Sequence, residues 1–245
     1  MLSAVTRFQL WSPSHWAVLI FGITFLVVAI FAQRKNPQSL WARGTLFLLI
    51  FANLTAAIHS ASAYLLLGLT SKLEGIIPLH LCDLVAFVAA AALITRKPIF
   101  CELTYYLGIG GTLQGLITPT LEYAFPHPVF LTFFHLHIFI VATALFLPLG
   151  LNWRPRRPLH KTLTRIFFLI CGYLIFAYGM NSILGTNYAF VMHKPKTASL
   201  YDHLGPYPWC LLSMLGLVII ALILLSLPFL FVKKETSPIS DPLES

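Results

Sequence analysis

Charged residues are scarce in this sequence: they make up 10% of its 245 residues, whereas 58% are hydrophobic. A soluble domain is nearer half apolar and a quarter charged, so lipid must solvate part of this apolar surface. The four cysteines are too few for a disulfide framework in a chain of this length. The glycines form no nucleotide-binding fingerprint, although Gly111 and Gly115 are spaced for close helix approach. The N-terminus lacks the features of a cleaved signal peptide. Together these features predict an integral membrane protein.

The apolar runs predict membrane-spanning helices. They are about 18 to 26 residues long and lack the alternation of barrel strands. The seven predicted spans are His15–Ala32, Thr45–Leu69, Leu79–Thr95, Pro98–Thr118, Pro128–Leu151, Thr162–Leu184 and Tyr207–Val232. We therefore expect an all-α, polytopic membrane helical bundle formed by residues 1–234, followed by a short flexible cytoplasmic tail at 235–245.

Lysine and arginine are divided unequally between the two sides of this arrangement. One side has Arg34, Lys35, Arg43, Arg96, Lys97, Arg154, Arg156, Arg157, Lys161, Arg165, Lys233 and Lys234, and the other has Arg7, Lys72, Lys194 and Lys196. Cytoplasmic loops carry the excess of basic residues, so we expect the N-terminus outside and the C-terminus in the cytoplasm. Tryptophans favour interfaces, and they fit this orientation, with Trp11, Trp16 and Trp209 at the outer interface and Trp41 and Trp153 at the inner one. The same distribution accounts for the net charge of +8, and we exclude nucleic acid as a partner.

Polar and ionisable side chains inside the spans are costly and often functional. In the predicted topology they gather in the outer half of the membrane. They are His59, His80, Cys82, Asp83, Gln114, Thr118, His135, His137 and Asn181, with Asn187, His193, His203 and Cys210 in or beside the last outer loop. Hydrogen bonds between packed helices could explain such a group. A hydrated pocket that opens to the outer leaflet is our preferred interpretation.

Cys82 is the intramembrane cysteine with several titratable neighbours. A thiolate is a strong nucleophile, but a buried thiol needs a neighbouring base to form it. His80 lies two residues away on the same helix and points about 200° from Cys82, although it can approach Asp83. The base must come from another helix, where His135 and His137 lie at a suitable depth. Those two side chains also diverge, so only one of them can face the pocket.

Two other contacts are expected near the membrane surfaces. Cys82 could instead form a disulfide with Cys210, since both lie near the outer face. Glu102 lies one turn inside the cytoplasmic end of its span, where it could extend towards Arg96 or Lys97. We assign Glu102 a structural role.

Five motifs resemble the YwaF-type bacterial integral membrane proteins, which places the chain in a bacterial cytoplasmic membrane. They are Pro78-Leu-His-Leu-Cys-Asp-Leu84, Gly111-Thr-Leu-Gln-Gly-Leu-Ile-Thr-Pro119, Gly185-Thr-Asn-Tyr188, His193-Lys-Pro195 and Gly205-Pro-Tyr-Pro-Trp209. The family's histidine follows two aromatics and two further residues, which corresponds to His137. His193 stands where the family more often has cysteine. A distant eukaryotic relative, an acyltransferase that remodels polyunsaturated ether phospholipids, resembles this chain in a Cys/His pair at Cys82 and His137. The androgen-induced membrane lipid hydrolases use a Thr/His pair in a similar helical frame.

The resulting hypothesis is covalent acyl transfer on membrane lipid, either to an acceptor or to water, without cofactor or metal. Cys82 is the expected nucleophile and His137 the expected base. The expected supporting residues are His80 and Asp83 as orienting groups and Gln114, Thr118, Asn181 or Asn187 as hydrogen-bond donors to the oxyanion.

Other functional classes fit less well. A transporter or channel for a small polar solute or ion could also use intramembrane histidines, but the chain shows no inverted repeat and its polar groups are near one face. A retinal protein needs a lysine inside the seventh span, and Lys233 and Lys234 lie beyond it. Haem held by His59 and His137 is geometrically possible. A zinc site at His135 and His137 is unfavourable because the two side chains diverge.

Overall fold

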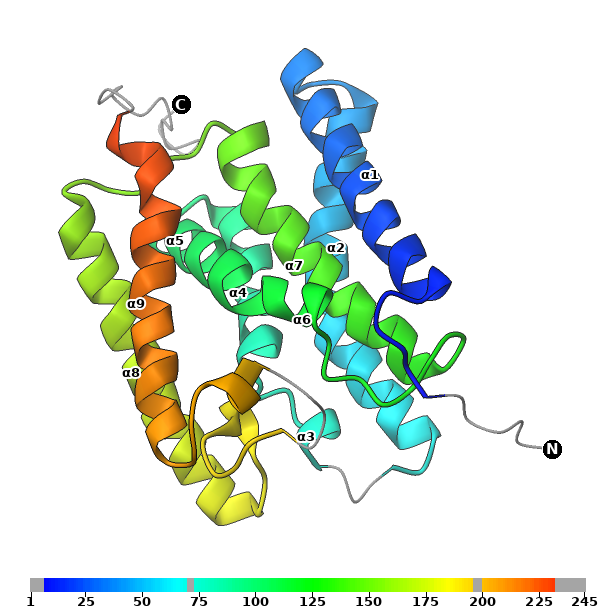
Figure 1. Ribbon diagram of the computed structural model, residues 1–245. Helices are drawn as coiled ribbons and strands as arrows, with labels where there is room; N and C mark the ends of the chain where they lie inside the picture. Colours follow the sequence, from blue (N-terminus) through cyan, green and yellow to red (C-terminus); the bar gives the residue numbers. More distant parts are fainter. Residues whose placement is uncertain (1–6, 70–72, 196–199, 232–245) are drawn as a thin grey trace.

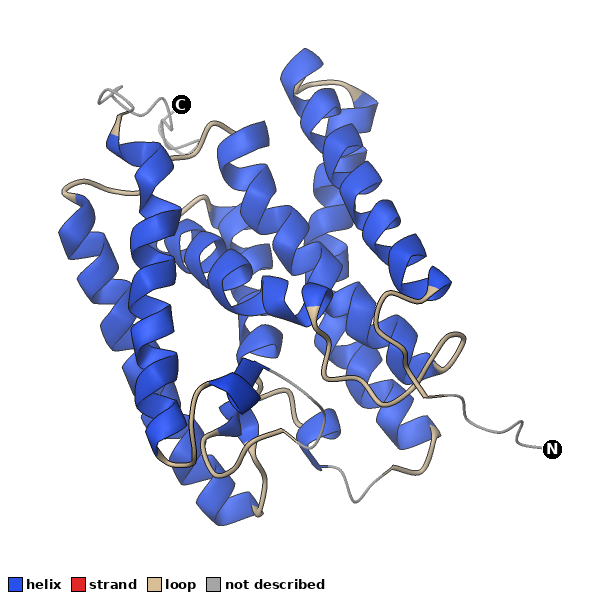
Figure 2. Cartoon of the chain, viewed as in Figure 1, coloured by secondary structure: helices blue, strands red, loops and turns tan. Residues whose placement is uncertain are grey.

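The computed structural model describes residues 7–69, 73–195 and 200–231. Helices and connecting loops make up this part of the chain, with one isolated bridge between Arg7 and Tyr123 (Figures 1 and 2). The helices are α1 (Pro13–Lys35), α2 (Leu40–Leu66), α3 (Leu73–Ile76), α4 (Leu81–Thr95), α5 (Pro98–Leu107), the π-helix η1 (Gly108–Thr112), α6 (Leu113–Ile117), α7 (Pro128–Gly150), α8 (Leu159–Leu184), the 3₁₀ turns η2 (Tyr188–Phe190) and η3 (Leu200–His203), and α9 (Trp209–Leu230). The predicted positions that lie outside the described residues are Lys72, Lys196, Val232, Lys233, Lys234 and the tail 235–245.

Six segments of the described chain are long and apolar enough to cross a membrane. They are Pro13–Lys35, Leu40–Leu66, Leu73–Thr95, Pro128–Gly150, Leu159–Leu184 and Trp209–Leu230. Each overlaps one of the predicted spans. The fourth predicted span is divided between α5, η1 and α6, which follow one another without a break, and none of these three is long enough alone to cross a bilayer.

The helix starts follow from local sequence signals. Pro13, Pro98 and Pro128 each occupy the first residue of a helix, where a missing N–H costs nothing and the fixed φ suits the helix. The hydroxyls of Ser12 and Ser39 accept hydrogen bonds from the first turns of α1 and α2, as N-cap residues do. These signals explain why the helix boundaries can be predicted within a few residues.

Helix α7 is the centre of the bundle. It contacts α1, α2, α4, α5, η1 and α6, and most of its spanning segment is buried. Helices α8 and α9 pack against each other and reach the rest of the bundle mainly through α5 and η1. In Figure 1 they lie on the flank opposite α1 and α2. The segment Pro98–Ile117 therefore lies between the two parts of the bundle.

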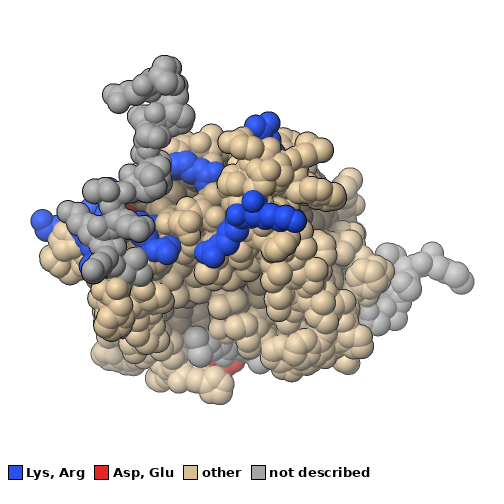
Figure 3. Space-filling model, turned by 90° about the horizontal axis from the view of Figure 1, so that it is seen from above, with Lys and Arg blue, Asp and Glu red and all other residues tan. Residues whose placement is uncertain are grey.

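Most of the described lysines and arginines gather at one end of the bundle, which we call the basic end; Arg7 and Lys194 do not. Figure 3 views the molecule from this side and shows lysine and arginine side chains spread across the face. Two contacts illustrate the arrangement, since Arg34 donates to the Leu149 carbonyl and Arg157 to the Phe229 carbonyl. Trp153 does not lie at the lipid interface as expected: it is buried in the core, against Tyr105.

Glu102 is completely buried at this end, and its partners differ from the expected Arg96 and Lys97. Arg156 donates from Nε to Oε1 at 2.8 Å and from NH2 to Oε2 at 2.6 Å, while Arg165 donates from NH1 to Oε2 at 3.2 Å. These hydrogen bonds to the carboxylate raise the pKa of Arg156. Arg96 and Lys97 were expected because they are close to Glu102 in the sequence. The packing of α5 against α8 instead brings the loop before α8 to the carboxylate.

Candidate functional site

The N-terminus of α4 places Cys82 in the first helical turn. Pro78 disfavours a helical conformation in the residue before it, and His80 is still extended, with φ −63° and ψ 149°. The Asp83 carboxylate then accepts the His80 backbone N–H at 3.2 Å, which is one half of a capping box. Asp83 therefore fixes the start of the helix through backbone, and does not bond the His80 ring as its spacing had suggested.

Helix α4 packs against η1, and Thr112 of η1 is close enough to interact with the Cys82 thiol, although no hydrogen bond joins the two in the described part of the chain. Thr112 is buried at the end of η1, and its hydroxyl also approaches the Leu107 carbonyl at 3.4 Å. All four cysteines are free, so the Cys82–Cys210 disulfide does not form. Thr112 was not among the expected site residues, although it ends the glycine-rich sequence of one of the motifs.

The imidazole of His137 is held in one orientation. Its Nδ1 lies 2.7 Å from the Phe133 carbonyl, and the ring stacks on the Phe133 side chain with centroids 4.1 Å apart. Because a carbonyl only accepts, Nδ1 carries the proton and Nε2 keeps a free lone pair. This is the tautomer that a general base requires.

Gly115 makes room for the other edge of that ring. A Cβ added at Gly115 would lie 2.5 Å from His137 Nε2 and 3.2 Å from Cγ, both shorter than van der Waals contact. Nε2 therefore faces the segment Pro98–Ile117. On this segment Thr112 and Gly115 are three residues apart, so they share one face of the helix.

Cys82 and His137 thus approach one face of the same helical segment from α4 and α7. Among the described residues no hydrogen bond joins the thiol to the imidazole; Cys82 interacts with Thr112, and His137 contacts Gly115. His80 is within electrostatic range of His137. We call Cys82, Thr112 and His137 the thiol–imidazole site.

His135 has a different environment. Its Nε2 lies 3.0 Å from the Ala52 carbonyl of α2, and its ring meets the His59 ring edge to face at 5.1 Å. The two α7 histidines therefore face different neighbours, with His137 towards α6 and His135 towards α2. This arrangement separates His59 and His137, the pair that could have held haem.

Tyr173 of α8 is a further neighbour that the sequence did not single out. Its hydroxyl donates to the Leu79 carbonyl at 3.1 Å. It is within electrostatic range of both Cys82 and Asp83. A lone tyrosine in an apolar helix is a weak signal, because only the tertiary packing shows that its hydroxyl reaches α4.

The loop after α8 accounts for Asn181 and Asn187. Asn181 donates from Nδ2 to the Tyr188 carbonyl at 3.0 Å and accepts the Tyr188 N–H at 2.7 Å. Asn187 donates to the His193 carbonyl at 2.8 Å, and its backbone N–H donates to Glu74 at 2.7 Å. Both amides therefore support the loop conformation.

The same loop covers His80. The Tyr188 ring meets the His80 ring at 5.1 Å, and the Tyr188 hydroxyl donates to the Ile77 carbonyl at 3.1 Å. Burial raises the pKa of Tyr188 to about 12, and the carboxylates of Glu74 and Asp83 add to this effect. Tyr188 is therefore a neutral donor that closes the site from the loop side.

Gln114 and Thr118 lie apart from the thiol–imidazole site. The Gln114 side chain donates to the Thr118 hydroxyl, and Gln114 is exposed. In the described part of the chain, no group of three or more His, Cys, Asp or Glu side chains is arranged to hold a metal ion. Cys82 packs against an apolar cluster formed by Ala56, Val85, Ala86, Leu136 and Ile140. Asp83, Thr112 and Tyr173 are the polar side chains that interact with it.

The helical bundle and its apolar spans define a multi-pass membrane protein. A model of the TMEM164 family matches residues 10–226, which is most of the chain, and the protein belongs to this family. No curated protein matches the chain, and no solved structure matches it.

Proposed function

We propose that this protein is a membrane-embedded lipid acyltransferase or acyl hydrolase in which Cys82 is the nucleophile and His137 the general base. The observation that carries the proposal is the shared helical segment: α4, which carries Cys82, packs against η1, which ends at Thr112, and the free Nε2 of His137 faces Gly115 three residues further on. The resemblance to YwaF-type proteins and to a Cys/His acyltransferase supports the same pair. Catalytic hydrogen bonds in unliganded enzymes are often longer than in the working complex.

In the first half of the reaction, His137 Nε2 takes the thiol proton and the sulfur attacks the carbonyl carbon of a lipid ester. The carbon–oxygen bond of the ester breaks, and the imidazolium returns its proton to the departing alcohol oxygen. The product is a thioester on Cys82. In the second half, the hydroxyl of a lysolipid or of water loses its proton to Nε2 and attacks the thioester. The thiolate leaves and recovers that proton from His137.

The oxyanion of each tetrahedral intermediate needs hydrogen-bond donors, a contribution of about 3 kcal/mol for one donor. Four side chains were expected to supply them: Gln114, Thr118, Asn181 and Asn187. Because the amides of Asn181 and Asn187 already support the loop, we assign this role to the backbone N–H groups in the first turn of α4. The Cys82 N–H has no carbonyl acceptor within the helix, and the positive end of the helix dipole lies beside the sulfur. His80 and Asp83 retain their proposed role as orienting groups.

The substrate lipid enters from the outer leaflet in this proposal. The segment Pro98–Ile117 forms a seventh span from α5, η1 and α6, the basic end faces the cytoplasm, and the N-terminus is outside. The membrane is the cytoplasmic membrane of a bacterium. Membrane lipids are the partners, and the reaction uses no cofactor or metal.

A transporter or channel is the competing proposal, and the packing at the basic end argues against it. The core there is filled by large apolar side chains, including Tyr106, Phe146, Leu147 and Ile166. Of the polar groups in this region, Glu102 is neutralised by Arg156 and Arg165. A polar path from the thiol–imidazole site to the cytoplasm would have to cross this core.

The test is to trap the acyl-enzyme. Purified protein in lipid nanodiscs is incubated with a phospholipid that carries a labelled acyl chain, and the Cys82 peptide is analysed for a hydroxylamine-sensitive label. We expect labelling in the wild type and in Cys171→Ala, none in Cys82→Ala, and labelling at least about a hundredfold slower in His137→Ala, as expected for loss of a general base. Undiminished lipid turnover in both Cys82→Ala and His137→Ala would refute the proposal.

A further inference from the structure

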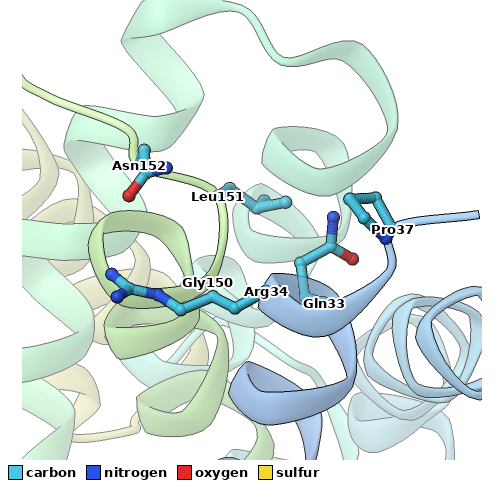
Figure 4. Close-up of a pocket in the computed structure, with 6 residues that line it drawn as sticks. All are labelled: Gln33, Arg34, Pro37, Gly150, Leu151 and Asn152. Atoms are coloured by element: carbon cyan, nitrogen blue, oxygen red, sulfur yellow. The ribbon is translucent and has the colours of Figure 1, made fainter.

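A hollow of about 540 Å³ lies at the basic end, far along α7 from the thiol–imidazole site. It is formed between the last turn of α1 and the end of α7, and its lining residues are Gln33, Arg34, Pro37, Gly150, Leu151 and Asn152 (Figure 4). Its volume is in the range of sites for small molecules. No acidic side chain lines it, so the Arg34 charge is not neutralised within the hollow.

The Arg34 guanidinium is held in place but only partly used. Its Nε donates to the Leu149 carbonyl at the end of α7, which orients the planar group across the hollow. In the described residues its two terminal nitrogens have no hydrogen-bond partner, and neither do the side-chain amides of Gln33 and Asn152. Asn152 has φ 53°, a conformation that asparagine tolerates better than most residues. In Figure 4 the Arg34 guanidinium and the Asn152 amide lie on one side of the hollow, and the Gln33 amide lies near Pro37 on the other.

A second hollow at the basic end does not combine an arginine with side-chain amides in this way. It is lined by Arg157, Pro158, Leu159, His160 and Leu230, but the Arg157 guanidinium already donates to the carbonyls of Phe229 and Leu230. The Arg34 hollow thus combines a guanidinium with unused donors and side-chain amides. The paired N–H donors of a guanidinium form bidentate hydrogen bonds with phosphate oxygens.

The surroundings of the Arg34 hollow point to a lipid as the source of the phosphate. Phe31 on α1 is 65% exposed, and Leu40 and Trp41 at the start of α2 are 85% and 78% exposed. Large exposed apolar groups next to cationic groups are typical of the level where headgroups meet acyl chains. A phospholipid could place its phosphate on Arg34 and its chains along the exposed side of α1.

We propose that the Arg34 hollow binds the phosphate of an anionic phospholipid from the cytoplasmic leaflet. Basic pockets on the cytoplasmic side of helical membrane proteins bind acidic lipid headgroups in this way. The bound lipid joins α1 to α7 at the end opposite the thiol–imidazole site. This proposal rests on the proposed orientation, with the basic end in the cytoplasm, and does not depend on the catalytic function.

The experiment measures lipid binding to the full-length protein in detergent by native mass spectrometry. The probes are short-chain phosphatidylglycerol, short-chain phosphatidylcholine and inorganic phosphate, each titrated separately, and inorganic phosphate is also titrated as a competitor of bound phosphatidylglycerol. We expect one saturable phosphatidylglycerol site, at least about tenfold tighter than the phosphatidylcholine site. Arg34→Gln should weaken phosphatidylglycerol binding about tenfold. Arg43→Gln is the matched control, since Arg43 lies at the same end and pairs with Gln38, and it should leave binding unchanged.

Two outcomes would overturn the proposal. Equal loss of binding in Arg34→Gln and Arg43→Gln would mean that general surface charge attracts the lipid. Inorganic phosphate that competes as well as phosphatidylglycerol would mean that the hollow is a site for soluble phosphate. If Arg34→Gln does not fold, Asn152→Gly removes one donor while keeping a backbone that tolerates positive φ. That variant should weaken binding severalfold, and unchanged binding would count against the site.

Discussion

The contact between Gly115 and the His137 ring allows a sharp test of the thiol–imidazole site. In Gly115→Ala the new methyl group would meet the imidazole at Cδ2 and at Nε2, the latter 2.5 Å away, with Cγ at 3.2 Å. Carbon and nitrogen atoms need about 3.5 Å, so the ring must move by about 1 Å or the helix must shift. The ring has little freedom, because Nδ1 is bonded to Phe133 and the ring stacks on its side chain.

Activity should respond far more than stability. A displacement of about 1 Å at a catalytic group can cost about a hundredfold in rate, and Nε2 is the atom that the proposed mechanism uses. Overpacking a core costs about 1 to 3 kcal/mol, whereas replacing a helical glycine with alanine returns about 1 kcal/mol. We therefore expect lipid acyl turnover to fall about a hundredfold, with a loss of stability of at most about 2 kcal/mol.

Gly111→Ala is the matched control on the same segment. A Cβ there would meet only Leu81 Cδ2, at 3.5 Å, which is ordinary van der Waals contact. Turnover with a labelled phospholipid and thermal unfolding in detergent would be measured for both variants. The reasoning fails if Gly115→Ala turns over lipid at the wild-type rate, or if Gly111→Ala loses as much activity as Gly115→Ala.

Two further predictions concern residues outside the thiol–imidazole site. Glu102→Gln leaves the guanidinium groups of Arg156 and Arg165 without their carboxylate, and should reduce the free energy of unfolding by about 3 kcal/mol; an unchanged thermal midpoint would contradict this. His15 is fully buried. Its Nδ1 accepts the Trp11 N–H at 3.1 Å, so Nε2 carries the proton and donates it to the Leu116 carbonyl at 2.8 Å. His15→Phe should cost about 2 to 4 kcal/mol for these two buried hydrogen bonds and lower acyl turnover, because it frees the end of α6; unaltered turnover at full stability would show that His15 does not position α6.

Helix positions could be predicted because they depend on local properties of the chain. Runs of apolar residues with proline at the start of α1 and α7 specify a spanning helix without reference to neighbours. The fourth predicted span differs from the others in helix type, because it runs through the π-helix η1. Gly108, Gly110 and Gly111 lie in this stretch, and a Cβ at Gly108 would lie 2.8 Å from Ala144. We attribute the wider π-helical turn η1 to the approach of α7. The sequence of one helix does not specify such a contact with another.

Partners of buried polar groups were harder to predict, and Asn181 illustrates why. In the sequence it is an amide inside a span, which could serve a ligand as readily as a loop. Its carbonyl and amide are used by Thr186 and Tyr188, residues that follow Gly185. Gly185 ends α8 with φ 65°, so the chain turns back and presents its backbone to Asn181. The residues of the motif Gly-Thr-Asn-Tyr therefore take part in closing the loop, and a catalytic role for Asn181 or Asn187 stays a prediction.

The choice between His135 and His137 also requires tertiary contacts, which local sequence patterns do not contain. Helix α7 is apolar on all sides, so its sequence has no polar face to show which direction is inward. The structure provides that direction through one small residue of another helix, because Gly115 is the position at which His137 fits. At His135 the partner is a backbone carbonyl of α2, which would accept a hydrogen bond from many donors. A requirement for glycine at 115 is therefore a more specific mark of the proposed base than the histidine itself. It follows that substitutions on α6, not only on α4 and α7, should control whether the imidazole and the thiol can act together.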